Sequence, residues 1–293
     1  MSEHRLDGRI EVWAPAKLNL FLEIQGRRED GYHDLESLML TVDLRDRLEI
    51  ADDPSGRLTL ECDDPRLPTG GENLVVKAAQ RLREATGTSR GASISLYKSI
   101  PAQAGLGGGS SDAAATLTAL DRVWATGCSP DRLDRLAGEI GSDVAFFRHG
   151  PAAVCRGRGE LVEDWALGTR LSFVLVCPPT GVSTADVYRR LIPPDRPRPI
   201  EPFLEALRSA DTAAIGRELF NRLQPVAESI HPGLTRVRDA LRSLVPSELD
   251  GTLMSGSGSA YFGLARSPDA AIAAANRLES LGLGQVHVVA SLP

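Results

Sequence analysis

The stretch IPAQAGLGGGSSDAA, residues 100–114, places four glycines directly in front of an alanine-rich segment. Each ordered glycine loses about 0.5–1 kcal/mol more backbone free energy than alanine, so such a loop needs a compensating contact. Glycine permits positive φ, close approach of a ligand to bare backbone, and N–H groups that converge on one concavity. We therefore expect Gly105, Gly107, Gly108 and Gly109 to form an anion site, with phosphate as the natural occupant.

A helix is expected to begin directly after the glycines. An apolar stripe at helical spacing follows them, formed by Ala113, Leu117, Leu120 and Trp124. The residues 110–112, Ser-Ser-Asp, are typical helix caps, and the positive end of the helix dipole favours an anion. The alternative interpretation is a flexible connector. The usual phosphate signatures fit poorly, because no lysine follows the glycines as in a P-loop and GLGGGS matches GxGxxG only loosely.

Composition sets the outer limits on the class of protein. With 293 residues, 42% hydrophobic and 25% charged, the chain is typical of a globular protein with about two domains. No apolar run approaches the ~18 residues of a membrane helix, and the first ten residues show no targeting signal, so a cytoplasmic location is expected. The net charge of −6 argues against a nucleic-acid partner. Four scattered cysteines lack metal-binding spacing and are expected to be reduced thiols.

Strand-like and helical patterns alternate along the whole chain, which predicts an α/β or α+β protein. Strands are expected near residues 14–24, 37–50, 92–97, 171–177, 260–265 and 286–290. Helices are expected over 73–87, ending at Gly87, and near 130–140 and 268–281, where Ser-Pro pairs provide caps. The proline-rich segment 178–199 is expected to be irregular. We place a domain boundary near residue 165.

Three stretches together resemble the motifs of the GHMP small-molecule kinases. They are APAKLNLFLEI (14–24), IPAQAGLGGGSSDAA (100–114) and LMSGSGSAYFGL (253–264). Within the last stretch, GSGSA (256–260) is interpreted as a tight loop backing the glycine loop. The further stretches DGYHDLES (30–37), EIGSDVAFF (139–147) and GVSTADVY (181–188) are similar to the family of isoprenoid-precursor kinases that phosphorylate 4-diphosphocytidyl-2-C-methyl-D-erythritol.

This resemblance implies a two-domain α+β fold of the GHMP kinase type. An ATP-binding domain, 1–165, would resemble a domain of a ribosomal protein, and a C-terminal GHMP kinase domain, 166–293, would follow. The implied activity is ATP-dependent phosphorylation of the substrate's 2-hydroxyl in the non-mevalonate (methylerythritol phosphate) route to isoprenoids. ATP with Mg²⁺ would be the cofactor, with metal ligands unassigned. The partner would be the small-molecule substrate alone, without nucleic acid or membrane, and the chain would act as a monomer or homodimer.

The resemblance also implies roles for individual residues. Lys17 and Asp143 match the catalytic positions. Asn73 and Lys98 match positions that contact the adenosine part of ATP. The other ATP-binding positions are Pro101, Ala102, Gln103, Ala104, Gly105, Leu106, Gly107, Gly108, Gly109, Ser110 and Ser111. The substrate-binding positions are Asn19, Tyr32, His33, Thr184 and Tyr188, of which the aromatic residues would contact cytidine.

Several of these residues also have simpler interpretations. Asp143 could be a helix N-cap, Asn73 could cap the helix that follows it, and the Tyr32–His33 pair after the Asp-Gly turn could lie free on the surface. Lys17 could be a solvated strand lysine, although it is one of only three lysines among 33 basic residues. Lys17 is expected to lie beside Asn19 on the polar face of its strand and to pair with Asp143.

Two rival functions stay open on the sequence alone. One is a sister GHMP kinase acting on homoserine, mevalonate or a sugar, which would lack the DGYH and GVSTxxVY stretches. The other is a non-catalytic nucleotide- or RNA-binding relative. The presence of both Lys17 and Asp143, together with the negative net charge, speaks against the second.

Overall fold

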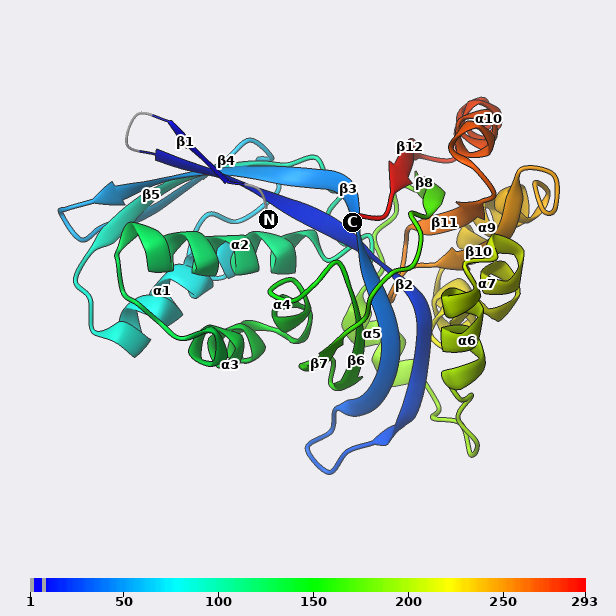
Figure 1. Ribbon diagram of the computed structural model, residues 1–293, viewed down its shortest axis with the longest axis horizontal. Helices are drawn as coiled ribbons and strands as arrows, with labels where there is room; N and C mark the ends of the chain where they lie inside the picture. The colour runs from blue at the N-terminus through cyan, green and yellow to red at the C-terminus, as the bar shows by residue number, and fades with distance from the viewer. Residues whose placement is uncertain (1–2, 7–8) are drawn as a thin grey trace. The chain divides into compact units, whose positions relative to one another are not determined.

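Two long strands, β2 (Arg9–Arg27) and β3 (His33–Asp53), each contribute residues to both of the compact units of the chain. The computed structural model describes residues 3–6 and 9–293 (Figure 1). The first unit contains the chain up to Ala16, Leu44–Ile100 and Gly107–Gly150, and the second contains Lys17–Asp43, Pro101–Leu106 and Pro151–Pro293. Both units are therefore discontinuous in sequence, and the family-domain boundary near residue 165 stays a prediction.

Helices of the first unit pack together beside its strands (Figure 1). Besides its share of β2 and β3, the unit contains β1 (Glu3–Leu6), β4 (Leu58–Cys62), α1 (Leu74–Thr86), β5 (Gly91–Tyr97), α2 (Gly108–Val123), α3 (Pro130–Ile140) and α4 (Ser142–Phe146). β5 pairs antiparallel with β3 and parallel with β4. The predicted apolar stripe of α2 is buried, and Trp124 Nε1 donates a hydrogen bond to the Gly91 carbonyl at 2.9 Å.

The predicted helix ends are confirmed for three helices. Asn73 Oδ1 accepts the Val75 N–H at the start of α1, and Gly87 ends that helix with φ +69°. Ser129 caps α3 and Ser267 caps α10 (Pro268–Glu279), each followed by proline at the first helical position. Local backbone chemistry therefore determines these boundaries.

The predicted cap of α2 is wrong. The helix begins at Gly108, its N-cap is Gly107 with φ +71°, and no side chain of the described residues caps it. Ser110 and Ser111 already lie inside the helix. The left-handed conformation of Gly107 ends the loop before the serines are reached, so the helix starts among the glycines themselves.

An antiparallel sheet forms the centre of the second unit, in the order β10 (Leu249–Met254), β11 (Tyr261–Ala265), β8 (Ser172–Cys177), β12 (Gln285–Ala290). Helices α9 (Leu234–Arg242) and α10 contact this sheet over a buried cluster that includes Val174, Val176, Tyr261 and Ala274. The unit contains β6 (Ala152–Gly157), β7 (Leu161–Asp164), β8 (Ser172–Cys177), α5 (Thr184–Arg190), α6 (Glu201–Ser209), α7 (Thr212–Glu218), β9 (Phe220–Asn221), α8 (Gln224–Ile230), α9 (Leu234–Arg242), β10 (Leu249–Met254), β11 (Tyr261–Ala265), α10 and β12 (Gln285–Ala290). The proline-rich segment is therefore not wholly irregular, because α5 lies within it.

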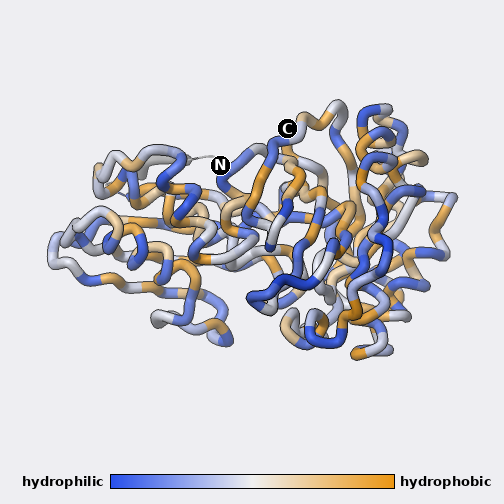
Figure 2. The backbone as a smooth tube through the Cα atoms, turned by 90° about the horizontal axis from the view of Figure 1, so that it is seen from below, coloured by the Kyte–Doolittle hydropathy of each residue, from blue (hydrophilic) through white to orange (hydrophobic). Residues whose placement is uncertain are grey.

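Hydrophobic and hydrophilic stretches alternate along the chain in both units (Figure 2). Over the part of the chain that the structure describes, no helix is both long and apolar enough to cross a membrane.

Both faces of β2 are buried in the second unit. The leucines predicted for the core are buried, and so are Lys17, Asn19 and Glu23 on the opposite face. Glu23 is stabilised by charge-assisted hydrogen bonds from Arg222 Nε at 2.8 Å and Nη2 at 2.6 Å, and by the backbone N–H groups of Ile24 and Arg198. Burial raises the pKa of Glu23, but these hydrogen bonds outweigh burial and lower it overall.

We predict that Glu23→Gln lowers the free energy of unfolding by about 3 kcal/mol, because it leaves the partly buried Arg222 without its counter-charge. The wild-type advantage is present above the unfolded-state pKa of about 4.3 and is lost as the pH falls through the lower folded-state pKa. Urea denaturation at pH 7 and at pH 3 measures both effects. As a control, Glu163→Gln breaks an exposed pair with Arg156 and should change stability by less than about 0.5 kcal/mol. Equal losses in the two variants would contradict the prediction.

Candidate active site

Ala104 and Gly105, in the middle of the glycine loop, pack against residues 255–260 of the same unit. Ala260 N–H donates to the Ala104 carbonyl at 3.0 Å, and Ser255 Oγ donates to the Gly105 carbonyl at 2.9 Å. Gly105 has φ +76°, and a Cβ there would lie 2.1 Å from the Ser255 carbonyl oxygen. Only glycine fits this position. The expectation that residues 256–260 back the glycine loop is confirmed.

Lys17 lies against both of these segments within the second unit. Its N–H donates to the Leu106 carbonyl at 2.9 Å, and its ammonium donates to Asn19 Oδ1. A Cβ at Gly256 would lie 3.1 Å from Lys17 Nζ. Because Lys17 is only 3% exposed, the interpretation as a solvated strand lysine is wrong.

Asn19 is fixed by neighbours on three sides. Its Nδ2 donates to Ser37 Oγ at 2.9 Å, and Ser37 Oγ in turn donates to the Phe21 carbonyl at 2.6 Å. Its backbone N–H contacts Ser255 Oγ at 3.4 Å. The amide oxygen of Asn19 therefore has a fixed direction, and this orients the Lys17 ammonium.

Asp143 lies in the first unit, in the first turn of α4. The N-cap of this short helix is Gly141, so the interpretation of Asp143 as the N-cap is wrong. Its carboxylate is half-buried. Lys17 and Asp143 belong to different units, and their pairing stays a prediction.

The two residues predicted to contact adenosine have protein partners in the first unit. Asn73 caps α1 through Oδ1 and donates through Nδ2 to the Pro68 carbonyl at 2.7 Å. The Lys98 ammonium contacts the carboxylates of Asp46 and Asp112, the latter at 2.7 Å. The capping role of Asn73 is confirmed, and the adenosine contacts of Asn73 and Lys98 stay predictions.

Sequence reasoning missed Asp46 and Asp112, which are both buried. Burial, and to a lesser extent the neighbouring Asp46, raises the pKa of Asp112 to about 8, although Lys98 acts in the opposite direction. For Lys98, burial alone would lower the pKa, but the two carboxylates raise it overall. The available signals were the scarcity of lysine in this chain and an aspartate directly after the two serines.

Of the residues predicted to contact cytidine, His33 and Tyr188 come together in the second unit. Gly31, with φ +86°, turns the chain between β2 and β3, and Asp30 Oδ1 accepts the Tyr32 N–H at 3.1 Å. The rings of His33 and Tyr188 lie 5.4 Å apart, although one follows this turn and the other lies on α5. Tyr32 is 57% exposed, and the Arg158 guanidinium lies 5.2 Å from its ring centroid. The aromatic surface is thus available to a flat ligand.

Two further interactions define the surroundings of these rings. Burial, and then the positive charge of Arg27, lowers the pKa of His33, so its imidazole is neutral at pH 7 and offers one donor and one acceptor. Thr184 Oγ1 lies 2.7 Å from Ser257 Oγ, which links the start of α5 to the loop behind the glycines.

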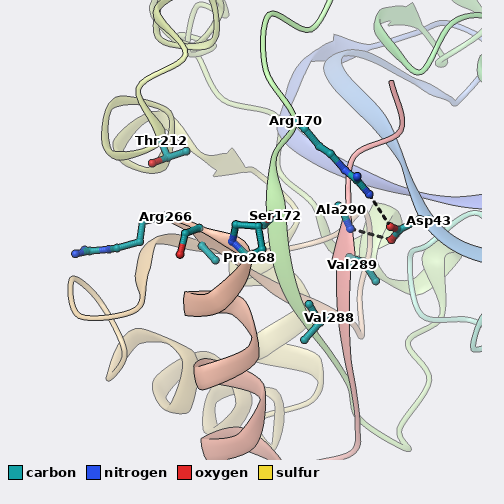
Figure 3. Close-up of a pocket in the computed structure, with 11 residues that line it drawn as sticks. Asp43, Arg170, Ser172, Thr212, Arg266, Pro268, Val288, Val289 and Ala290 are labelled. Carbon is teal, nitrogen blue, oxygen red and sulfur yellow. Dashed lines mark hydrogen bonds and ion pairs between the residues drawn. The ribbon is translucent and has the colours of Figure 1, made fainter.

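A cavity of about 310 Å³ in the second unit lies away from all of these residues. Asp43, Arg170 and Arg266 are among the residues that line it (Figure 3). Asp43 accepts hydrogen bonds from Arg170 and from the Ala290 N–H, at 3.2 and 2.8 Å. Of the described residues that line it, none is a predicted site residue, so this cavity is not the candidate site.

Comparisons with known proteins show the family and the fold. Residues 73–154 match the GHMP kinases N terminal domain, and residues 203–282 match the GHMP kinases C terminal family. A 4-diphosphocytidyl-2-C-methyl-D-erythritol kinase of Pelotomaculum thermopropionicum is 44% identical over 257 residues, 87% of this chain and 88% of the relative. A crystal structure of 4-(cytidine 5'-diphospho)-2C-methyl-D-erythritol kinase superimposes with a TM-score of 0.80 at 40% identity, covering 97% of this chain and 100% of the other.

A more distant structure shares the fold alone. Homoserine kinase from Cytophaga hutchinsonii is 22% identical, with a TM-score of 0.75 over 100% of this chain and 97% of the other. The two-domain α+β fold predicted from the sequence is therefore confirmed.

We predict that Gly105→Ala lowers the free energy of unfolding by at least about 2 kcal/mol, because it adds both a Cβ clash and an unfavourable positive φ. Gly109→Ala is the matched control. The nearest atom to its added Cβ is Leu74 Cδ1 at 3.8 Å, and its position is helical, so stability should stay the same or rise by up to about 1 kcal/mol. Chemical denaturation of both variants tests this, and similar losses in the two would contradict it.

Proposed function

The chain belongs to the GHMP kinase family, and from that premise we propose that it transfers the γ-phosphate of ATP to the 2-hydroxyl of 4-diphosphocytidyl-2-C-methyl-D-erythritol. The observation that carries the choice of substrate is the ring contact between His33 and Tyr188, together with the exposed ring of Tyr32, which precedes His33 in the sequence. Stacking of a base on an aromatic side chain contributes about 1–3 kcal/mol, and the neutral imidazole suits hydrogen bonds to a pyrimidine edge. The substrate is thus recognised at the end that does not react.

ATP would bind to the segment Pro101–Ser111. Its glycines carry no side chains that could cover the backbone N–H groups, and the start of α2 adds the positive end of a helix dipole. The loop is held by the contacts of Gly105 and Leu106 to the rest of the second unit. Such preorganised donors stabilise the charge on the transferring phosphoryl group without having to reorganise during the reaction.

Two residues would act on the reacting oxygens. Asp143 is proposed to accept the proton of the substrate hydroxyl, and the Lys17 ammonium to stabilise the negative charge that develops there. Burial strengthens the effect of the Lys17 charge, because the surrounding dielectric is low. Asn19 would keep that ammonium in place.

Mg²⁺ would enter with the nucleotide. Ser111 Oγ is buried and has no hydrogen-bond partner among the described residues, and a hydroxyl oxygen is a suitable ligand for this hard cation. Ser111, with the neighbouring Ser110, is therefore the candidate to hold it. The bound cation would supply neutralisation of phosphate charge.

We further propose that the kinase acts in the cytoplasm on its small-molecule substrate, without a nucleic-acid or membrane partner, as a monomer or homodimer. The net charge of −6 supports the part of this proposal that excludes a nucleic-acid partner.

A coupled ADP-release assay across four acceptors tests the function. We predict turnover with 4-diphosphocytidyl-2-C-methyl-D-erythritol, and rates at least a hundredfold lower with homoserine, mevalonate and galactose. Asp143→Asn and Lys17→Met should lower kcat by about 10²–10⁴-fold and leave the KM for ATP within a few fold.

Glu163→Gln is the control for these variants, because it changes an exposed pair of the second unit. It should retain wild-type kinetics. Full activity on homoserine with none on the cytidylyl compound would overturn the assignment.

A further inference from the structure

Three buried charges of the first unit form a cluster in which Lys98 is a predicted ATP-binding residue and the two aspartates have no role so far. The Lys98 side chain is only 9% exposed, and its ammonium contacts Asp46 Oδ2 and Asp112 Oδ2. Asp46 and Asp112 are themselves almost completely buried. With one ammonium and two carboxylates, the cluster cannot be neutral unless one carboxylate holds a proton, and buried charge of this kind is costly.

The cluster joins the two ends of the glycine loop. On the entry side, Asp46 Oδ1 accepts the N–H groups of Ser99 and Ile100 at 2.6 and 2.8 Å, directly after Lys98. On the exit side, Asp112 lies in the first part of α2, after the glycines. The Asp46 side chain, on β3, therefore binds the backbone N–H groups of the loop entry and is connected to the loop exit through Lys98.

The exit also packs directly on the entry. A Cβ at Gly108 would lie 3.0 Å from Ile100 Cγ2 and 3.3 Å from Asp46 Oδ2. Residues 98–100 and 108–112 thus form a closed base, from which residues 101–107 emerge as the loop.

The composition of the cluster argues against a role in stability alone. Asp112 Oδ1 is buried and has no hydrogen-bond partner among the residues that the structure describes. An unsatisfied buried polar atom costs about 1–3 kcal/mol, and buried ion pairs are often no more stabilising than apolar packing. What this arrangement provides instead is a fixed geometry at both ends of the loop.

We propose that Asp46 and Asp112 are positioning residues for ATP, which act through Lys98 by holding the entry and exit of the glycine loop in the geometry that binds the triphosphate. This inference rests on the proposed function and adds to it two residues that contact neither substrate. Lys98 then contributes to nucleotide binding as the centre of this cluster, because it contacts both aspartates.

The experiment measures equilibrium binding of two probes to the full-length protein by calorimetry. The probes are the non-hydrolysable ATP analogue AMP-PNP with Mg²⁺, and 4-diphosphocytidyl-2-C-methyl-D-erythritol. For Asp46→Asn we expect at least tenfold weaker binding of AMP-PNP and a change of less than twofold for the cytidylyl compound. Lys98→Met should show the same selective loss.

The matched control is Asp52→Asn on the same strand. Asp52 pairs with Arg90 at the surface, 2.9 and 2.6 Å from its guanidinium, so this variant removes an ion pair without touching the loop. Both affinities should stay within twofold of wild type. A purely structural role for the cluster predicts that Asp46→Asn weakens both probes equally or neither, and either result would overturn the proposal.

A second variant keeps the proposal testable if Asp46→Asn does not fold. Asp112→Asn preserves the shape of the side chain, and amide hydrogen exchange of residues 99–110 should be at least tenfold faster than in wild type, with weaker AMP-PNP binding. If the amide exchange rates and the AMP-PNP affinity are both unchanged, the proposal is contradicted. If the wild-type protein binds AMP-PNP but does not phosphorylate the cytidylyl compound, the proposed function fails, while the AMP-PNP affinities and exchange rates still decide this inference.

Discussion

The close approach of two backbone segments at Gly105 is the constraint on which the rest of the site depends. The room for a side chain at this position is taken by the Ser255 carbonyl, and the same segments are joined by hydrogen bonds at Ala104 and Gly105. Lys17 adds β2 to this assembly through its bond to the Leu106 carbonyl. Three stretches that are distant in sequence are therefore held together by main-chain geometry, and this provides the support that a glycine-rich loop lacks by itself.

Buried polar side chains lie next to these three segments. Removing them from water costs free energy, which their hydrogen-bond partners must offset. On β2, Lys17 and Asn19 are enclosed by serines and glycines, and Glu23 is enclosed by Arg222 and backbone donors. Each of these groups is satisfied by partners that also fix its direction. The polar side chains of β2 are therefore buried and held in fixed orientations rather than solvated. This suits a kinase that works by placing charge around a phosphoryl group.

Local sequence signals predicted local structure well. The strands around residues 14–24 and 171–177 and the caps at Asn73, Ser129 and Ser267 follow from alternation and from single side chains, and all are present. The start of α2 was misplaced because serines are common caps, whereas the conformation of Gly107 is not visible in composition. Asp46 and Asp112 were missed because their meaning depends on Lys98, a contact between distant parts of the chain. The roles of the individual site residues come from resemblance, and the structure adds the partners that orient them.

The central claim is that bare backbone in the glycine loop binds the triphosphate. Amide chemical shifts of ¹⁵N-labelled protein, recorded during titration with AMP-PNP and Mg²⁺, measure this directly. We predict that the largest shifts occur at the N–H groups of Gly105, Gly107, Gly108 and Gly109 and at the first turn of α2. Saturable binding that leaves these amides unchanged and shifts other regions would contradict the claim.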